Sequence, residues 1–407
     1  MARDRGMAQT AGMPDDLAAA VRPLFPALAR YAAFLDGPGG SQLPASAIDA
    51  MAAYLRGGTA NDGGVFATSR ETVALLASAR AAAADLTCSD PGAIAFGPNM
   101  TTLNFLLAHA VARLFEPGDE IVVTQLDHDA NVAPWLAVAR DHGLVVRTAP
   151  IRVDDATLDL DALAGMIGDR TRVVAFTLAS NATGSLTPAR QIAALAHDAG
   201  ALAWADAVHF APHRRPDRRG LDLDVLLCSP YKLFGPHLGI AALRPDLAAS
   251  LPADRVRPAS EDPPGHRFET GTPSFEALAG FVASMAYLSG LGDGDLDAAY
   301  ARIRSYEDSV SRYALERLLG VDGLRLYGIA DVDRVGERTP TFCFTLRGEP
   351  PRETNARLAA AGVFAWDGNY YAQELFSALG VGGAVRAGFL HYNTVAEVDR
   401  LVAALVA

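Results

Sequence analysis

Short apolar segments alternate with longer amphipathic segments between about residue 70 and residue 245. The apolar segments predict strands at Ile121–Thr124, Val145–Ala149, Val173–Leu178, Leu202–Ala205 and Val225–Leu227. Helical periodicity lies between them, at Thr102–Leu114, Pro134–His142, Leu160–Ile167 and Ala189–Ala199. Strands that are apolar throughout and separated by helices are typical of a parallel sheet covered on both faces. The pattern therefore predicts an α/β fold with a mostly parallel sheet.

A Pro-rich connection over residues 245–275 leads into a different pattern. Two long helices are expected at Phe275–Leu291 and Asp295–Leu319, and short strands and helices follow in α+β order. We therefore expect an N-terminal segment (1–30), a large domain (31–275) and a smaller α+β domain (276–407). Part of the N-terminal segment is expected to belong to the smaller domain. Residues 1–14 are small and polar, and we expect them to be loosely held.

Composition excludes several classes of protein. The chain has 407 residues, of which half are apolar, and its net charge of −12 comes without a basic stripe, so nucleic acid is not an expected partner. The three cysteines are widely spaced and predict neither a zinc site nor a disulfide framework, and no metal is expected. The N-terminus lacks the apolar stretch of a signal peptide, and no segment approaches the roughly 18 apolar residues of a membrane span. A cytoplasmic location is the default.

Lys232 lies in a tight Ser/Pro/Gly loop between two apolar strands. An ammonium in apolar surroundings loses hydration, so its pKa falls and its amine becomes free to condense with an aldehyde. Asp206 ends a predicted strand upstream of this loop. Pyridoxal phosphate needs such a pair, because a lysine binds its aldehyde carbon and a carboxylate keeps its pyridine nitrogen protonated. The two residues therefore indicate a Schiff-base enzyme that uses pyridoxal phosphate.

Polar residues at other predicted strand and helix ends suit the same cofactor. Asn99, Met100 and Thr101 begin a helix, where they either cap it or offer N–H groups to a phosphate; with the lysine and the carboxylate present we favour phosphate. His128 follows a strand at the sheet edge where ligands bind in open α/β folds, and its ring suits stacking or proton transfer. Asn131 is a candidate for substrate binding, and it also suits a helix cap.

Two further residues, Asn181 and Arg386, carry two interpretations each. Asn181 is either a turn residue before a glycine or a hydrogen-bond partner of the cofactor's phenolic oxygen, which His209 also suits. Arg386 lies on an otherwise apolar strand and needs a planar anionic partner. That partner is either a structural carboxylate or the α-carboxylate of a substrate.

Four motifs in register resemble the class V aminotransferase family, with the cysteine desulfurase-like proteins as the nearest branch. The motifs are Asp206–His209, Ser229–Pro236, Arg267–Pro273 and Tyr392–Thr394 followed by Glu397–Asp399. The resemblance covers about residues 30–407 and implies a fold-type I enzyme that binds pyridoxal phosphate and works as a homodimer.

The resemblance also implies a role for each matching residue. Lys232 would be the Schiff-base lysine, Asp206 the partner of the pyridine nitrogen, and His128 the residue stacked on the ring. Asn181 and His209 would lie near the phenolic oxygen, and Thr101 and Ser229 would bind phosphate. Tyr231 stands where many relatives have His, so one phosphate contact would come from a phenol. Thr272 would reach the phosphate of the neighbouring subunit, and Arg386 would hold the substrate carboxylate.

One departure from the family decides the expected reaction. The desulfurases carry a persulfide-forming cysteine on a loop shortly before the arginine, where this chain has Trp366–Ala372. Without a nearby thiolate, no nucleophile attacks the sulfur of a substrate. We therefore predict β-elimination from a cysteine S-conjugate, a C–S lyase reaction, with Tyr370 and Tyr371 lining the side-chain pocket and supplying a proton or a stacking face. Relatives in natural-product (secondary) sulfur metabolism fit this reaction.

Other reactions stay open at this point. The same scaffold supports transamination, epimerisation, decarboxylation with oxidative deamination, and cysteine desulfuration. A protein that binds pyridoxal phosphate without turnover is an alternative of another class. A nicotinamide-dependent enzyme is disfavoured, because no G-x-G-x-x-G follows an early strand.

Overall fold

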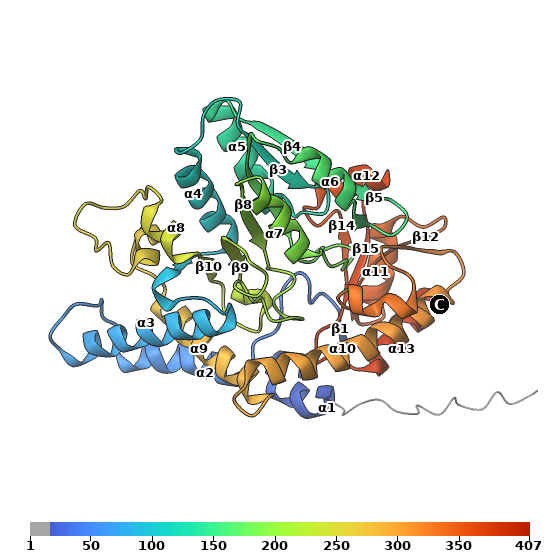
Figure 1. Ribbon diagram of the computed structural model, residues 1–407. Helices are drawn as coiled ribbons and strands as arrows, with labels where there is room; N and C mark the ends of the chain where they lie inside the picture. The colour runs from blue at the N-terminus through green and yellow to red at the C-terminus, as the bar shows by residue number, and fades with distance from the viewer. Residues whose placement is uncertain (1–16) are drawn as a thin grey trace, which may run out of the picture.

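The computed structural model describes residues 17–407, so the expectation for residues 1–14 lies outside the described part. Figure 1 shows a large sheet beside a smaller one. The large sheet has the order β2-β10-β9-β8-β7-β3-β4. Its strands are β2 (Ile94–Gly97), β3 (Glu120–Thr124), β4 (Val145–Ala149), β7 (Thr171–Thr177), β8 (Leu202–Asp206), β9 (Val225–Cys228) and β10 (Gly239–Leu243).

Strand β10 is the antiparallel member of this sheet. It pairs antiparallel with both β9 and β2, whereas the neighbours from β9 to β4 pair in parallel. The loop between β9 and β10, which carries Lys232, is too short to join two parallel strands, because a parallel connection needs a crossover of a dozen or more residues. The predicted α/β fold with a mostly parallel sheet is confirmed.

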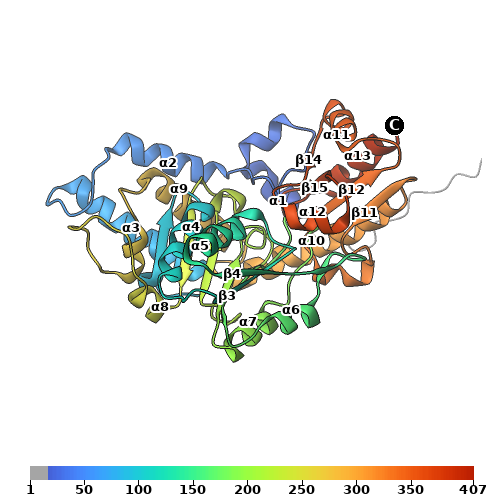
Figure 2. The same ribbon diagram turned by 90° about the horizontal axis from the view of Figure 1, so that it is seen from above.

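Alternate residues of each strand pack on opposite faces of the large sheet. Val173 and Ala175 of β7 belong to the core formed with α4 and α5, whereas Val174 and Phe176 belong to the core formed with α3, α7 and α9. In Figure 2, seen from above, α4 and α5 lie near the centre, α3 and α9 toward the left and α7 at the lower edge. The covering helices are α4 (Met100–Ala112), α5 (Ala133–His142) and α8 (Pro245–Ser250) on one face, and α3 (Ala67–Leu86), α7 (Ala189–Asp198) and α9 (Phe275–Gly290) on the other.

Helices α2 (Ala45–Gly57) and α3 and strand β2, all in the first hundred residues, were not predicted. Helix α2 packs along α9, and β2 forms the edge of the large sheet beyond β10. Helix α2 buries only Ala47 and leaves Ile48 and Leu55 half exposed.

The small sheet has the order β11-β12-β15-β14, and a separate two-stranded sheet includes a strand of the N-terminal region. Strand β1 (Ala33–Phe34) pairs in parallel with β13 (Val363–Phe364). The sheet strands are β11 (Leu324–Tyr327), β12 (Thr341–Leu346), β14 (Trp366–Gly368) and β15 (Ala384–Gly388). The remaining elements are α1 (Leu17–Val21), β5 (Ile151–Arg152), β6 (Thr157–Leu158), α6 (Leu160–Met166), α10 (Leu296–Leu319), α11 (Pro351–Ala360), α12 (Gln373–Leu379) and α13 (Val395–Val406).

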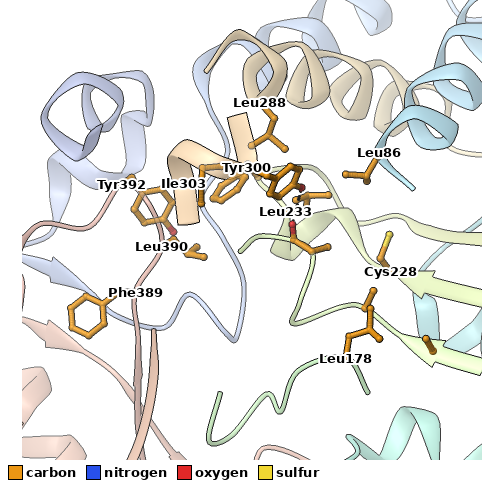
Figure 3. Close-up of a cluster of buried hydrophobic side chains, with 14 of the residues drawn as sticks. Leu86, Leu178, Cys228, Leu233, Leu288, Tyr300, Ile303, Phe389, Leu390 and Tyr392 are labelled. Atoms are coloured by element: carbon orange, nitrogen blue, oxygen red, sulfur yellow. Dashed lines mark hydrogen bonds between the residues drawn. The ribbon is translucent and has the colours of Figure 1, made fainter. Parts of the chain in front are cut away.

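One buried core is continuous between the two sheets. Figure 3 shows Leu178 and Cys228 from the large sheet, Tyr300 and Ile303 from α10, and Phe389 after β15, all buried in this core. Because the core crosses from one sheet to the other, the division into domains near residue 275 stays a prediction. Within residues 17–407, no helix combines the length and the apolar character needed to cross a membrane.

Gly239 provides a test of the packing between the large sheet and α4. A Cβ at this position would lie 2.4 Å from the carbonyl carbon of Asn99, so a side chain displaces backbone on one side or the other. We expect Gly239→Ala to lower the free energy of unfolding by about 1–3 kcal/mol. Gly165→Ala is the matched control, since its Cβ would meet nothing within 4 Å among the described residues. Denaturant unfolding measures both, and equal midpoints would contradict this account.

Candidate active site

A cavity of about 550 Å³ lies at the carboxyl ends of the central strands. Strands β3, β7, β8 and β9 end at this edge, so the residues that follow them converge there. The cavity is lined by all the predicted cofactor ligands except Thr272, namely Met100, Thr101, His128, Asn181, Asp206, His209, Ser229, Tyr231 and Lys232.

Lys232 is the only lysine among the 35 lysine and arginine residues of the chain. It ends a 3-10 turn (Pro230–Lys232) after β9, and it is buried. Burial and the positive charge of Arg386 lower the pKa of Lys232 to about 8, although the charge of Asp206 opposes this. A substantial fraction of the amine is therefore neutral and nucleophilic near physiological pH.

Asp206 ends β8 and faces the same cavity. Burial raises the pKa of Asp206 to about 6, while the Val208 N–H, 2.8 Å from Oδ1, and the charge of Lys232 favour the carboxylate. The group is therefore mainly ionised at pH 7. A buried carboxylate of this kind suits a protonated ring nitrogen.

The N-terminus of α4 forms one end of the cavity. The Met100 N–H donates to Ser229 Oγ at 3.0 Å, and the Asn99 side chain accepts from the Thr102 N–H at 2.8 Å. Asn99 thus caps the helix, which is one of the two interpretations given for the residues that begin it. Thr101 and Ser229 line the cavity beside this helix end, an arrangement that suits a phosphate. The Tyr231 ring stacks on His237 near this end, with centroids 5.2 Å apart.

His128 presents a neutral ring to the cavity. Its Nδ1 accepts a hydrogen bond from the Ala130 N–H at 3.0 Å, so the ring proton lies on Nε2. Burial, together with the charges of Lys232 and Arg386, lowers the pKa of His128 to about 3. A flat, uncharged imidazole suits stacking on an aromatic ring.

Two buried atoms at the cavity have no partner among the described residues: Asn181 Oδ1 and His209 Nδ1. Their other polar atoms are engaged, since Asn181 Nδ2 donates to the Tyr370 carbonyl at 2.9 Å and His209 Nε2 lies 3.0 Å from Thr341 Oγ1. Buried polar atoms without partners are unusual and indicate a bound group or water. The lysine, the carboxylate, the helix end and these atoms together fit pyridoxal phosphate.

A second hollow of about 270 Å³ shares Lys232 and Asn181 with the cofactor cavity and holds Arg386. The Arg386 guanidinium lies 3.0 Å from Asp36 and donates to the Asn181 carbonyl at 2.9 Å, while its buried Nε has no partner among the described residues. Asp36 is thus a structural carboxylate for the arginine, and sequence analysis did not select it as a site residue. The feature of the sequence that marks Asp36 is the Gly-rich loop that follows it.

Not every candidate lies in these hollows. Thr272 is exposed and lines a separate hollow with Phe96 and Glu269, so its role in a neighbouring subunit stays a prediction. Asn131 is fully buried and lines neither hollow, because its side chain contacts Asn104 and Asp127.

Sequence analysis also missed the buried carboxyl of Asp127. Burial raises the pKa of Asp127 to about 7, although hydrogen bonds from the Asn131 and Thr124 side chains act to lower this pKa. This network fixes the start of the loop that carries His128. Its signal was the Asp-His-Asp sequence directly after a strand.

Tyr370 and Tyr371 both line the second hollow, with different orientations. The Tyr370 hydroxyl donates to the carbonyls of Ala384 and Trp366, so it is not free to supply a proton to a substrate. Tyr371 is 72% exposed, and its ring centroid lies 5.5 Å from that of His128.

No cysteine of the described chain lines either hollow. Cys228 and Cys343 are fully buried, and burial raises the pKa of each thiol to about 12. Burial likewise raises the pKa of Cys88 to about 11. None of the three is therefore a thiolate at the candidate active site.

The profile of the aminotransferase class-V family matches residues 33–401. The chain belongs to this family. It is 33% identical to an uncharacterized protein of Mycobacterium tuberculosis, MT3887, over 95% of this chain and 98% of that one. It is also 33% identical to a cysteine desulfurase of Serratia proteamaculans, over 95% and 96% of the two chains.

The solved structures agree with this family. The Escherichia coli cysteine desulfurase CsdA superposes with a TM-score of 0.83 at 27% identity, covering 95% of this chain and 97% of that one. This class V member is a fold-type I, cysteine desulfurase-like enzyme whose cofactor is pyridoxal phosphate.

The pKa of Lys232 predicts how cofactor uptake depends on pH. Only the neutral amine attacks an aldehyde, so the uptake rate should rise about tenfold per unit below pH 8 and level off above it. Stopped-flow absorbance of the apo-protein mixed with pyridoxal phosphate measures this rate. Asp206→Asn should move the midpoint to lower pH, because the carboxylate raises the amine's pKa.

Lys232→Ala is the control for uptake. It removes the only lysine, so borohydride should fix no cofactor to this variant, whereas the parent chain gains one cofactor in its mass spectrum. A rate that is flat from pH 6 to 10, or cofactor fixed to the variant, would be inconsistent with the assigned role.

Proposed function

We propose that this enzyme is a C–S lyase that eliminates a thiol from a cysteine S-conjugate, releasing pyruvate and ammonia. The observation that carries the proposal is a cavity whose residues fit pyridoxal phosphate, with no cysteine of the described chain lining it or the adjoining hollow. A desulfurase needs a cysteine thiolate that attacks the substrate's sulfur, whereas the three cysteines here are protonated thiols and none of them lines either hollow. Elimination requires no such nucleophile.

Each residue of the site has a task in this reaction. Pyridoxal phosphate, when bound, supplies the electron sink that makes loss of the α-proton possible. Lys232 Nζ takes the α-proton, and Asp206 holds the positive charge of the ring nitrogen. The C–S bond then breaks with its electron pair on sulfur, and the thiolate takes up a proton. Water converts the remaining three-carbon unit into pyruvate and ammonia.

Arg386 would orient the substrate. Its guanidinium is buried over the Tyr370 ring, 4.3 Å from the centroid, and one of its N–H groups still lacks a partner. We propose that it binds the α-carboxylate of the amino acid while Asp36 keeps it in place. The carboxylate would then lie on the side of the site away from α4.

We also propose a cytoplasmic homodimer. The three cysteines are free, as expected in a reducing compartment. Thr272 is exposed beside a hollow that also contains Thr102 and His237, both of which line the cofactor cavity. A second subunit that covers this hollow would bring its own Thr272 to the phosphate end.

Cysteine desulfuration is the second candidate, because relatives with 33% identity bear that name. The two reactions give different products. With S-methylcysteine we expect equal amounts of thiol and pyruvate and no sulfane sulfur. Replacing Cys88, Cys228 or Cys343 singly by Ala should leave this rate within about threefold, whereas Lys232→Ala should abolish it. Sulfide formed rapidly from free cysteine, and lost on Cys228→Ala, would instead establish desulfuration.

Removal of the arginine tests the carboxylate site. Losing a charge-assisted contact costs about 2–5 kcal/mol, so Arg386→Ala should raise KM by about 30-fold or more. Cofactor absorbance should survive, because Arg386 lines the second hollow and not the cofactor cavity. Steady-state kinetics with S-methylcysteine measures the effect. An unchanged KM would mean that the pair with Asp36 is purely structural.

A further inference from the structure

The segment from Trp366 to Tyr371 connects the small sheet to the second hollow. It begins in β14, where Trp366 is the strand partner of Arg386 on β15. The exposed rings of Trp366 (57%) and Tyr371 (72%) both line the hollow that holds Arg386 and Lys232. Two large aromatic rings therefore remain in contact with solvent beside the reacting groups.

The backbone that carries these rings is held in an unusual conformation. Tyr370 and Tyr371 have φ values of 54° and 57°, in the left-handed region that bulky residues rarely adopt. Two hydrogen bonds hold it there, from Asn181 Nδ2 to the Tyr370 carbonyl at 2.9 Å and from the Asp129 N–H to the Tyr371 carbonyl at 2.7 Å. Both donors belong to loops at the ends of the large sheet. Strain maintained in this way at a site indicates that the position of the side chains matters.

The position of the Tyr371 ring follows from these contacts. It lies beside His128, with centroids 5.5 Å apart and planes tilted by 38°. The Tyr370 ring faces the guanidinium of Arg386 from within the protein, and its hydroxyl is engaged. The Tyr370 ring is thus engaged by the guanidinium, whereas the Trp366 and Tyr371 rings line the hollow and stay exposed.

We propose that Trp366 and Tyr371 form an aromatic subsite for the side chain of the substrate, selecting amino acids that carry a ring or another large apolar group. The proposal rests on the proposed function for the orientation of the amino acid, with its amine toward Lys232 and its carboxylate toward Arg386. A side chain leaving the same carbon has the two exposed rings within the same hollow, whose other lining residues, besides the lysine and the arginine, are Asp36, Pro38, Gly39, His128, Asn181, Tyr231 and Tyr370. Aromatic faces bind apolar rings by stacking and gain nothing from the bare thiol of cysteine.

The test measures binding without C–S cleavage. Titration of the holoenzyme with L-phenylalanine and with L-alanine, followed by the cofactor's absorbance, gives a Kd for each. We expect phenylalanine to bind at least tenfold more tightly than alanine. Trp366→Ala and Tyr371→Ala should each remove most of this preference and leave the Kd of alanine within twofold. Equal Kd values in the parent enzyme, or a preference that survives both variants, would overturn the proposal.

Two further variants separate stacking from other effects. Tyr371→Phe keeps the ring and should keep the preference; if it behaves like Tyr371→Ala, the hydroxyl is responsible and the stacking proposal is wrong. Phe66→Ala removes an aromatic ring that is 56% exposed and lines neither hollow, so it should leave both Kd values unchanged. A loss of preference in this control would show that the effect is not specific to the subsite.

Kinetics with two thioethers distinguishes this proposal from the proposed reaction. If S-benzylcysteine and S-methylcysteine both release thiol at the same kcat/KM, the lyase activity stands and the aromatic subsite does not. If phenylalanine binds preferentially but neither thioether releases thiol, the subsite stands and the lyase activity fails. If both proposals hold, kcat/KM should be at least tenfold higher for the benzyl substrate, and Tyr371→Ala should remove the difference.

Discussion

The site depends on one buried ammonium and one buried carboxyl that face the same cavity. Burial penalises the charged form of each, so the pKa of Lys232 falls and that of Asp206 rises, while each charge partly stabilises the other. The sheet brings them together, because Asp206 on β8 is the strand partner of Leu227 on β9, just before the lysine loop. The tight return into β10 then keeps the loop over the ends of the strands.

The second sheet completes the site from the other side. It contributes Arg386, and the segment that begins in β14 contributes the aromatic residues. Asn181, which follows β7 of the large sheet, bonds to both parts: its carbonyl accepts a hydrogen bond from Arg386, and its side chain donates one to the Tyr370 carbonyl. The continuous core around α10 fixes the two sheets relative to each other. A change in that core would therefore alter the distance between Lys232 and Arg386, even though no residue of this core lines either hollow.

The environment of the cysteines is the reason for proposing elimination instead of persulfide formation. A reactive thiolate needs exposure or a nearby positive charge that lowers its pKa. Cys343 is the strand partner of Arg386, yet its burial outweighs that charge and keeps the thiol protonated. The segment before Arg386 instead carries aromatic rings on a backbone tied to the large sheet. A fixed segment of this kind suits recognition of a substrate better than transfer of sulfur to a partner.

The sequence alone determined the α/β class, the central strands, the lysine with its carboxylate and most of the cavity lining, because apolar runs and the residues that end them are local signals. It did not reveal α2, which buries only Ala47, or α3, or β2 at the sheet edge. Only the tertiary structure decided that Asp36 pairs with Arg386, 350 residues away, and that Asn131 supports Asp127 instead of lining a hollow. It also decided that the Tyr370 hydroxyl is occupied while the Tyr371 ring is free. Such outcomes depend on which distant groups meet once the sheets pack, and no local pattern records those distances.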